Sequence, residues 1–114
     1  MLRRSSRLTT GQFEEAVTKG RVFHSPFFLM RALPSGGADA SKVAAVAPVK
    51  VAKTAVLRNR TRRRVYAAVR PVVIDTLKPG WHIILIAKPA LLGQTTAEIA
   101  RDIAALFVKA GLVR

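Results

Sequence analysis

The chain has 114 residues, of which 20 are Lys or Arg and 6 are Asp or Glu, so its formal net charge is +14. This length suits one domain spanning residues 1–114, and a hydrophobic content of 50% argues against a wholly disordered basic tail. The lack of cysteine excludes a disulfide scaffold and a thiolate zinc site. No uncharged apolar stretch is long enough to span a membrane, and we therefore expect a cytoplasmic protein.

The first third of the chain predicts a short helix followed by a strand. Thr9 or Thr10 can cap a helix over residues 11–18, and Gln12 stands where a capping box with Thr9 requires it. Aromatic and aliphatic residues bounded by two prolines then predict a strand over residues 27–33.

The middle of the chain predicts a second strand and a long helix. Residues 42–49 favour a strand antiparallel to the first, and Pro48 near its end indicates an edge strand or the exit from the strand. Residues 54–76 follow a helical period, and Pro71 inside that period predicts a kink or a break. The apolar arc of this helix consists of Leu57, Thr61, Val65, Ala68, Val69 and Val72.

The last third predicts a buried strand and a closing helix. The continuous apolar run over residues 81–87 is typical of a strand covered on both faces. Thr95 and Glu98 form a second capping box, and the helix after it has an apolar stripe made of Ile99, Ile103, Leu106, Phe107 and Ala110. The order α-β-β-α-β-α predicts an α+β fold, a single two-layer domain with helices against a small mixed sheet.

Positive charge is concentrated in the middle of the chain. Nine basic residues and no acidic residue lie between positions 40 and 74, which is under a third of the chain. Like charges packed this densely repel one another, and a polyanion relieves the repulsion. Nucleic acid is therefore the leading class of partner. An anionic membrane surface is second, and it is disfavoured because the basic helix lacks large apolar anchors.

Five arginines within seven residues lie on the long predicted helix, and Asn59 stands among them: Arg58, Arg60, Arg62, Arg63 and Arg64. Guanidinium groups stay charged at cellular pH and bind phosphate oxygens in a bidentate manner. Asn59 adds an uncharged donor and acceptor for a base edge or a ribose hydroxyl. The alternative is a solvated basic face without a specific ligand. The scarcity of nearby acids favours contact with nucleic acid.

The segment Ala55-Val56-Leu57-Arg58-Asn59-Arg60-Thr61-Arg62-Arg63 resembles the signature of the bacterial ribonuclease P protein component, an Arg-Asn-Arg preceded by Ala-Val and followed by Lys/Arg-Arg. The similarity extends over nearly the whole chain. It includes Arg7-Leu8 with Phe13 soon after, the Gly20-Arg21 turn, the run from Gly80 to Pro89, and Leu106-Phe107 in the closing helix.

This resemblance implies the protein subunit of an endoribonuclease whose catalyst is an RNA. It implies a left-handed β-α-β crossover, a 1:1 complex with the catalytic RNA, and binding of the 5′ leader of precursor tRNA so that the leader is removed. Catalysis and Mg²⁺ would belong to the RNA, with no catalytic residue, metal ligand or cofactor on the protein. The implied RNA-binding residues are Arg58, Asn59, Arg60, Arg62 and Arg63. The implied leader-binding residues are Phe13, Phe28, Lys50 and Lys53.

The chain departs from the family pattern at several places. The family usually has a Gly-Asn pair just before the helix, and here Lys53 and Thr54 stand in its place. A tight turn that needs a positive φ at this point would favour the glycine. Tyr66 stands where an Arg is common, and Arg64 stands where an apolar residue is common. Val17 and Arg31 occupy positions where relatives often have aromatic residues that face the leader.

Two other classes of function remain as alternatives. A small basic ribosomal or RNA-assembly protein without a role in tRNA processing would share the size, the charge and the basic helix. A DNA-binding regulator would need a helix before the arginines, and residues 42–49 predict a strand instead. The acidic residues show no catalytic spacing, and we interpret His24 and His82 as packed or edge histidines of apolar strands.

Overall fold

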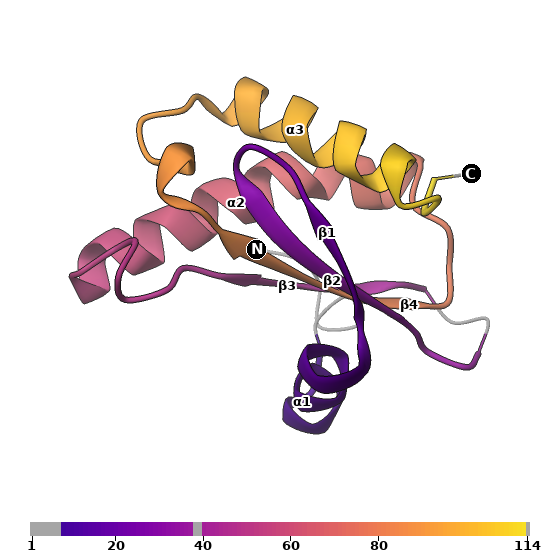
Figure 1. Cartoon of the computed structure of the whole chain (residues 1–114). Helices are drawn as coiled ribbons and strands as arrows, with labels where there is room; N and C mark the ends of the chain where they lie inside the picture. Colours follow the sequence, from indigo (N-terminus) through magenta and orange to yellow (C-terminus); the bar gives the residue numbers. More distant parts are fainter. Residues whose placement is uncertain (1–7, 38–39, 114) are drawn as a thin grey trace.

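A four-stranded sheet with helices on both of its faces organises the chain (Figure 1). The computed structural model describes residues 8–37 and 40–113, and only the backbone of residues 73–75, so Arg7 of the Arg-Leu pair lies outside the described residues. The elements are α1 (Thr10–Lys19), β1 (Arg21–His24), β2 (Phe28–Pro34), β3 (Lys42–Val46), α2 (Ala55–Asp75), β4 (Trp81–Ala87), a 3₁₀ turn η2 (Pro89–Leu91) and α3 (Thr96–Lys109).

The sheet is mixed, with the strand order β1-β2-β4-β3. The β1–β2 and β2–β4 pairs are antiparallel, whereas β3 and β4 are parallel. Helix α2 is the crossover that connects β3 to β4. The predicted α+β class and mixed sheet are confirmed. Strand β3 runs opposite to β2 as expected, but β4 lies between them. The left hand of the crossover stays a prediction.

The chain contains one strand more than the sequence predicted, so the order is α-β-β-β-α-β-α. The aromatic segment before Pro34 folds back on itself as the β1–β2 hairpin. Ser25 makes this turn, because its backbone amide donates to Phe28 O at 2.9 Å and its hydroxyl accepts from Phe28 N at 3.1 Å. A side chain that bonds to nearby backbone in this way ends a strand.

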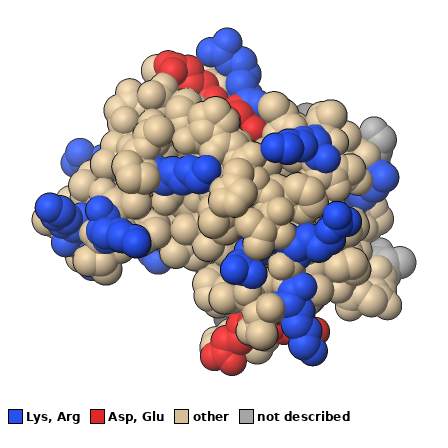
Figure 2. All heavy atoms as spheres, viewed as in Figure 1, with Lys and Arg blue, Asp and Glu red and all other residues tan. Residues whose placement is uncertain are grey.

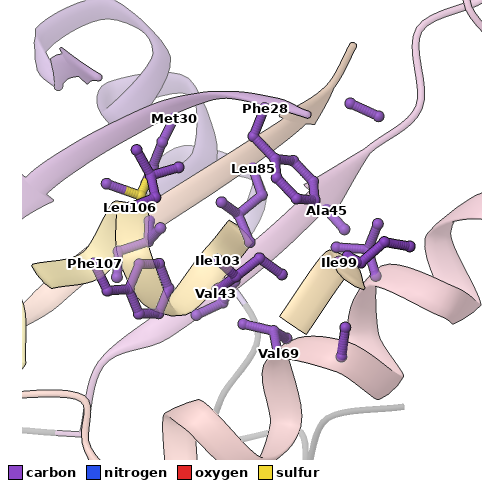
Figure 3. Packing of buried hydrophobic residues seen from close by; sticks show 14 of the residues in the cluster. Phe28, Met30, Val43, Ala45, Val69, Leu85, Ile99, Ile103, Leu106 and Phe107 are labelled. Carbon is purple, nitrogen blue, oxygen red and sulfur yellow. The ribbon is translucent and has the colours of Figure 1, made fainter. Parts of the chain in front are cut away.

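The main core lies between the sheet and the α2–α3 pair (Figures 1 and 3). Alternate residues of the strands point into it, as the two-residue period of a strand requires. The buried set from the strands includes Phe28, Met30, Val43, Ala45 and Leu85, and the helices contribute Val65, Ala68, Val69, Ile99, Ile103, Leu106 and Phe107. Each large side chain among them stabilises the fold by about 1.5–3 kcal/mol through burial.

Helix α2 carries the arginines and is longer than a break at Pro71 would allow. Thr54 caps it by accepting a hydrogen bond from Leu57 N at 3.1 Å, and the helix then continues to Asp75. The helix therefore does not break at Pro71, and the alternative of a kink there stays a prediction. Proline at position 71 removes the bond to the carbonyl of Ala67, and because Ala67 and Pro71 are both exposed, water can satisfy that carbonyl.

Helix α1 lies on the sheet face opposite α2 and α3 (Figure 1). The predicted capping box is present: Gln12 N donates to Thr9 Oγ1 at 3.2 Å and Thr9 N donates to Gln12 Oε1 at 3.0 Å. A Cβ on Gly20 would lie 2.4 Å from Ala16 O and 3.2 Å from Arg31 Cβ. The missing side chain at position 20 thus lets the end of α1 approach β2 closely and fixes the helix over the sheet.

Candidate RNA interface

The outer face of α2 presents a group of polar side chains to solvent. Asn59, Arg60, Arg62 and Arg63 are all exposed, as the sequence predicted. Arg62 Nη2 donates to Asn59 Oδ1 at 3.1 Å, so the amide and the guanidinium are held together. Figure 2 shows Lys and Arg distributed over the visible face of the molecule, while acidic groups gather in two places. A surface rich in Lys and Arg attracts a polyanion.

Two shallow grooves run between the side chains of this face. The first has a volume of about 360 Å³ and is lined by Val56, Asn59, Arg60, Arg63 and Arg64. The second has a volume of about 250 Å³ and is lined by Asn59, Arg62, Arg63 and Tyr66. Both are open to solvent and combine guanidinium donors with an amide. They suit phosphate, ribose and base edges better than an apolar small molecule.

Arg58 lies differently from the other predicted RNA-binding residues. Its side chain is half-buried, and its Nη1 donates to Ala52 O at 3.1 Å and to Lys53 O at 3.4 Å. The guanidinium therefore faces back toward the turn that precedes α2 and does not lie free on the outer face. Its partners are main-chain carbonyls, so this contact could not be predicted from the pattern of side chains in the sequence.

Two departures from the family pattern have partners inside the chain. The hydroxyl of Tyr66 accepts a hydrogen bond from Ala45 N on β3 at 3.1 Å, and its ring packs against the core. The guanidinium of Arg64 donates to Gln94 O in the connection between η2 and α3. Both side chains therefore join α2 to the rest of the fold.

The predicted leader contact at Phe28 is contradicted by its burial. Phe28 is 0% exposed and packs among the core residues on the α2–α3 side, so it offers no ring on which a base could stack. Its neighbour Leu29 points to the opposite face, and the register aligns Leu29 with Ile86 and Ile86 with Val46. These three half-buried side chains form an apolar row on the face that also carries α1.

The alternation of residues along β2 is the signal that could have found this row. A two-residue period places Phe28 and Leu29 on opposite faces, but only the position of the helices decides which face is the core. We name the row Leu29, Ile86 and Val46 the α1-side row.

The other predicted leader-binding residues are accessible. Phe13 is half-buried on α1, and Lys50 and Lys53 are exposed in the turn after β3. Val46 is the last paired residue of β3, so the chain passes directly from the α1-side row into this lysine turn. We define the lysine turn as residues 48–53. The described residues with positive φ are all glycines, and the lysine turn contains no glycine, so none of its residues has positive φ. The departure from the family pattern at Lys53 and Thr54 therefore causes no left-handed strain in the turn.

Two polar side chains lie side by side on the sheet under α1, where the register aligns His82 with Lys42 on one side and with Leu33 on the other. Lys42 Nζ donates to Gln12 Oε1 of α1 at 3.3 Å. Burial lowers the pKa of His82 below its ordinary value, the charge of Lys42 lowers it further, and Glu15 opposes the shift. His82 is thus kept neutral over a wider pH range than a solvent-exposed histidine.

Within residues 8–37 and 40–113, no three His, Asp or Glu side chains come together as a metal site. None of the helices found in those ranges has the length and apolar character needed to cross a membrane.

Comparison with known proteins gives one consistent result. The family model described as Ribonuclease P matches residues 2–111. A ribonuclease P protein component from Gluconacetobacter diazotrophicus is 33% identical over 101 residues, covering 89% of this chain and 86% of the relative. One from Synechococcus elongatus is 36% identical over 98 residues, covering 82% and 80%.

Solved structures agree on the fold. The RNase P protein of Staphylococcus aureus aligns with a TM-score of 0.80 at 20% identity, covering 97% of this chain and 100% of that one. The RNase P protein of Thermotoga maritima aligns with a TM-score of 0.77 at 19% identity, covering 90% and 96%. Because a family model matches almost the whole length and two relatives above 30% identity cover at least 82% of it, the chain belongs to the ribonuclease P protein family.

Proposed function

We propose that this ribonuclease P protein subunit binds the catalytic RNA through the outer face of α2 and the 5′ leader of precursor tRNA on the α1 side of the sheet. In the complex it assists endonucleolytic removal of the leader, which forms the mature 5′ end of the tRNA. The observation that carries the proposal is the outer face of α2, where Asn59, Arg60, Arg62 and Arg63 are exposed together on one rigid helix. Family membership supports the choice of RNA.

Docking on the catalytic RNA follows from electrostatics. Each phosphate neutralised by a cation releases condensed counterions, so the affinity falls as salt rises. Guanidiniums on a helix keep a fixed spacing, and this gives the contact more geometric specificity than a flexible basic tail has. Asn59, held by Arg62, can bind a base edge or a ribose hydroxyl beside the phosphates.

The leader would bind in a different manner, because it is single-stranded. An unpaired base stacks on an aromatic ring with about 1–3 kcal/mol, and Phe13 is the aromatic side chain that we assign to this contact. The α1-side row offers an apolar surface, and Lys50 and Lys53 offer charge where that surface ends. Phe28, which is fully buried, supports this surface from behind.

Catalysis is assigned to the RNA together with Mg²⁺ bound there, and the protein acts as an accessory subunit. The residues of the protein bind the two RNAs, orient the precursor and neutralise phosphate charge. By reducing repulsion between two polyanions, the catalytic RNA and the precursor, the subunit should lower the magnesium concentration that cleavage requires. A 1:1 complex is sufficient for this role, because the two proposed surfaces lie on one chain.

Reconstitution tests the proposal. The protein is combined with a bacterial ribonuclease P RNA and a precursor tRNA, and cleavage is followed at low and at high Mg²⁺. We expect the protein to accelerate formation of the mature 5′ end at low Mg²⁺, and the Arg60→Ala/Arg63→Ala variant to lose most of the effect. Arg101→Ala is the control for the loss of an exposed cation outside α2, because it removes one such charge from α3. If the wild-type chain has no effect on cleavage, the alternative of a ribosomal or RNA-assembly protein is favoured.

A further inference from the structure

We propose that the ring of Tyr66 is a stacking surface for one unpaired base of the catalytic RNA. The base would enter the second groove on the outer face of α2, beside the guanidiniums of Arg62 and Arg63. The inference rests on the proposed function, because it concerns the same helix face. It adds to that face a contact that does not depend on charge.

The second groove follows one row of side chains along α2. Arg62, Arg63 and Tyr66 come three, four and seven residues after Asn59, so the helical period places all four on one face. The row extends about 10 Å along the helix axis. The groove has a volume of about 250 Å³ and is open to solvent, which leaves room for one base turned out of an RNA helix. Tyr66 is the aromatic residue among the four.

Tyr66 is held in place by contacts inside the protein. Its hydroxyl accepts a hydrogen bond from Ala45 N on β3 at 3.1 Å, and its ring packs against the main core. The side chain is half-buried, and its exposed part lines the groove. An aromatic side chain that is fixed before binding loses little conformational entropy when a base stacks on it. The ring is therefore a preorganised surface.

The other side chains of the groove suit a nucleotide. Arg62 Nη2 donates to Asn59 Oδ1 at 3.1 Å, which orients the amide and leaves its NH2 group as a donor for a base edge. A guanidinium plane can stack on a base, and its N–H groups can bind the attached phosphate. The bases of a regular duplex are paired and stacked on one another, so they offer no free face to a ring. The groove therefore favours an unpaired nucleotide.

The test compares Tyr66→Leu with Tyr66→Phe in binding to the catalytic RNA. Loss of the bond to Ala45 N is common to both variants, and only Tyr66→Leu also lacks the ring. We expect Tyr66→Leu to bind this RNA about 5- to 150-fold more weakly than Tyr66→Phe, the range for one base–aromatic stack. The difference should be the same at each salt concentration, because neither variant removes a cation. Circular dichroism under the conditions of the binding assay checks that both variants are folded.

Equal affinities of the two variants for the catalytic RNA would overturn the inference. A difference that appears only when a precursor with a leader is added to the holoenzyme would also overturn it, because the ring would then contact the leader. Should Tyr66→Leu fail to fold, the wild-type chain labelled with 3-fluorotyrosine takes its place, since one tyrosine gives one ¹⁹F resonance. Stacking should shift this resonance when the catalytic RNA is added, and an unchanged resonance would contradict the proposal.

Failure of the inference and failure of the proposed function are distinguishable. If the wild type does not bind the catalytic RNA, both fail. If the wild type binds, Arg60→Ala/Arg63→Ala loses affinity, and Tyr66→Leu binds as Tyr66→Phe does, then only the role of Tyr66 is wrong.

Discussion

The hydroxyl of Tyr66 accepts a hydrogen bond from the backbone amide of Ala45 at 3.1 Å. Ala45 belongs to β3, which has β4 on one side and is the outer strand of the sheet on the other. An edge strand presents unpaired amides, and proteins commonly cover or block such edges. Tyr66 covers this one from α2, so the helix that carries the exposed arginines is joined directly to the sheet.

Replacement of Tyr66 by Phe should therefore destabilise the protein while the RNA-binding charge is unchanged. Loss of the acceptor leaves the amide of Ala45 without its partner, and we expect the free energy of unfolding in urea to fall by about 1 kcal/mol. The salt slope of RNA binding should stay the same, because no cation is removed. An unfolding free energy equal to that of the wild type would show that water replaces the hydroxyl at no cost.

Phe28 and Phe13 should respond differently to truncation. Phe28→Ala opens a cavity in the main core and should lower the unfolding free energy by about 3–5 kcal/mol. Phe13 is half-buried outside that core, so Phe13→Ala should cost clearly less. Thermal or urea unfolding measures both, and equal losses for the two variants would contradict the placement of Phe28 in the core and Phe13 outside it.

Phe13→Ala should weaken binding of a precursor with a leader more than binding of mature tRNA. The proposed reason is the loss of one base–aromatic stack, which is about 1–3 kcal/mol. Val108→Ala on α3 serves as the control, because it truncates an exposed side chain distant from α1 in the chain. Affinities for the two RNAs are measured with the reconstituted holoenzyme. A Phe13→Ala variant that weakens both equally would return Phe13 to a packing role.

His82 predicts a dependence of stability on pH. Its pKa is lowered in the folded protein mainly by burial and also by Lys42, while in the unfolded chain it has the ordinary value near 6.5. The unfolded state therefore binds the proton more readily, and the folded state loses stability as the pH falls below about 6.5.

The measurement for His82 is urea unfolding at pH 7.5 and pH 5.5, where carboxylates titrate little. We expect the wild type to lose more stability across this interval than His82→Gln does. The charged groups that face His82 from neighbouring elements are Lys42 on β3 and Glu15 on α1, and both are present in the wild type and in the variant. An identical loss in both proteins would contradict the assignment.

Much of the helical structure could be predicted because its signals are local. The capping box of Thr9 and Gln12 is complete. Of the second predicted box only half forms: Thr95 Oγ1 accepts from Glu98 N, but the Glu98 carboxylate accepts from the Thr95 hydroxyl and not from its backbone amide. Strand β4 has the predicted bounds, because a continuous apolar run between turns leaves little alternative. The hairpin within residues 21–34 was not predicted, since its turn depends on one hydroxyl of Ser25.

The site was harder to predict, because exposure depends on partners far along the chain or on backbone atoms. Arg58 and Arg60 are residues of the same type on the same helix. They differ because Arg58 donates hydrogen bonds to the backbone carbonyls that precede the helix. Phe28 and Leu29 are neighbours, and the packing of α2 and α3 decides which of them is buried. Composition and periodicity therefore identified the basic helix, while the contacts of its individual arginines could be found only from the fold.

The salt dependence of affinity for the catalytic RNA tests the central claim most directly. We predict tight binding by the wild type, and for Arg60→Ala/Arg63→Ala a fold that is unchanged by circular dichroism and a salt slope smaller by about 1.4–1.8, which corresponds to two lost phosphate contacts. A double variant that binds this RNA with the affinity and salt slope of the wild type would contradict the claim that the outer face of α2 is the docking surface.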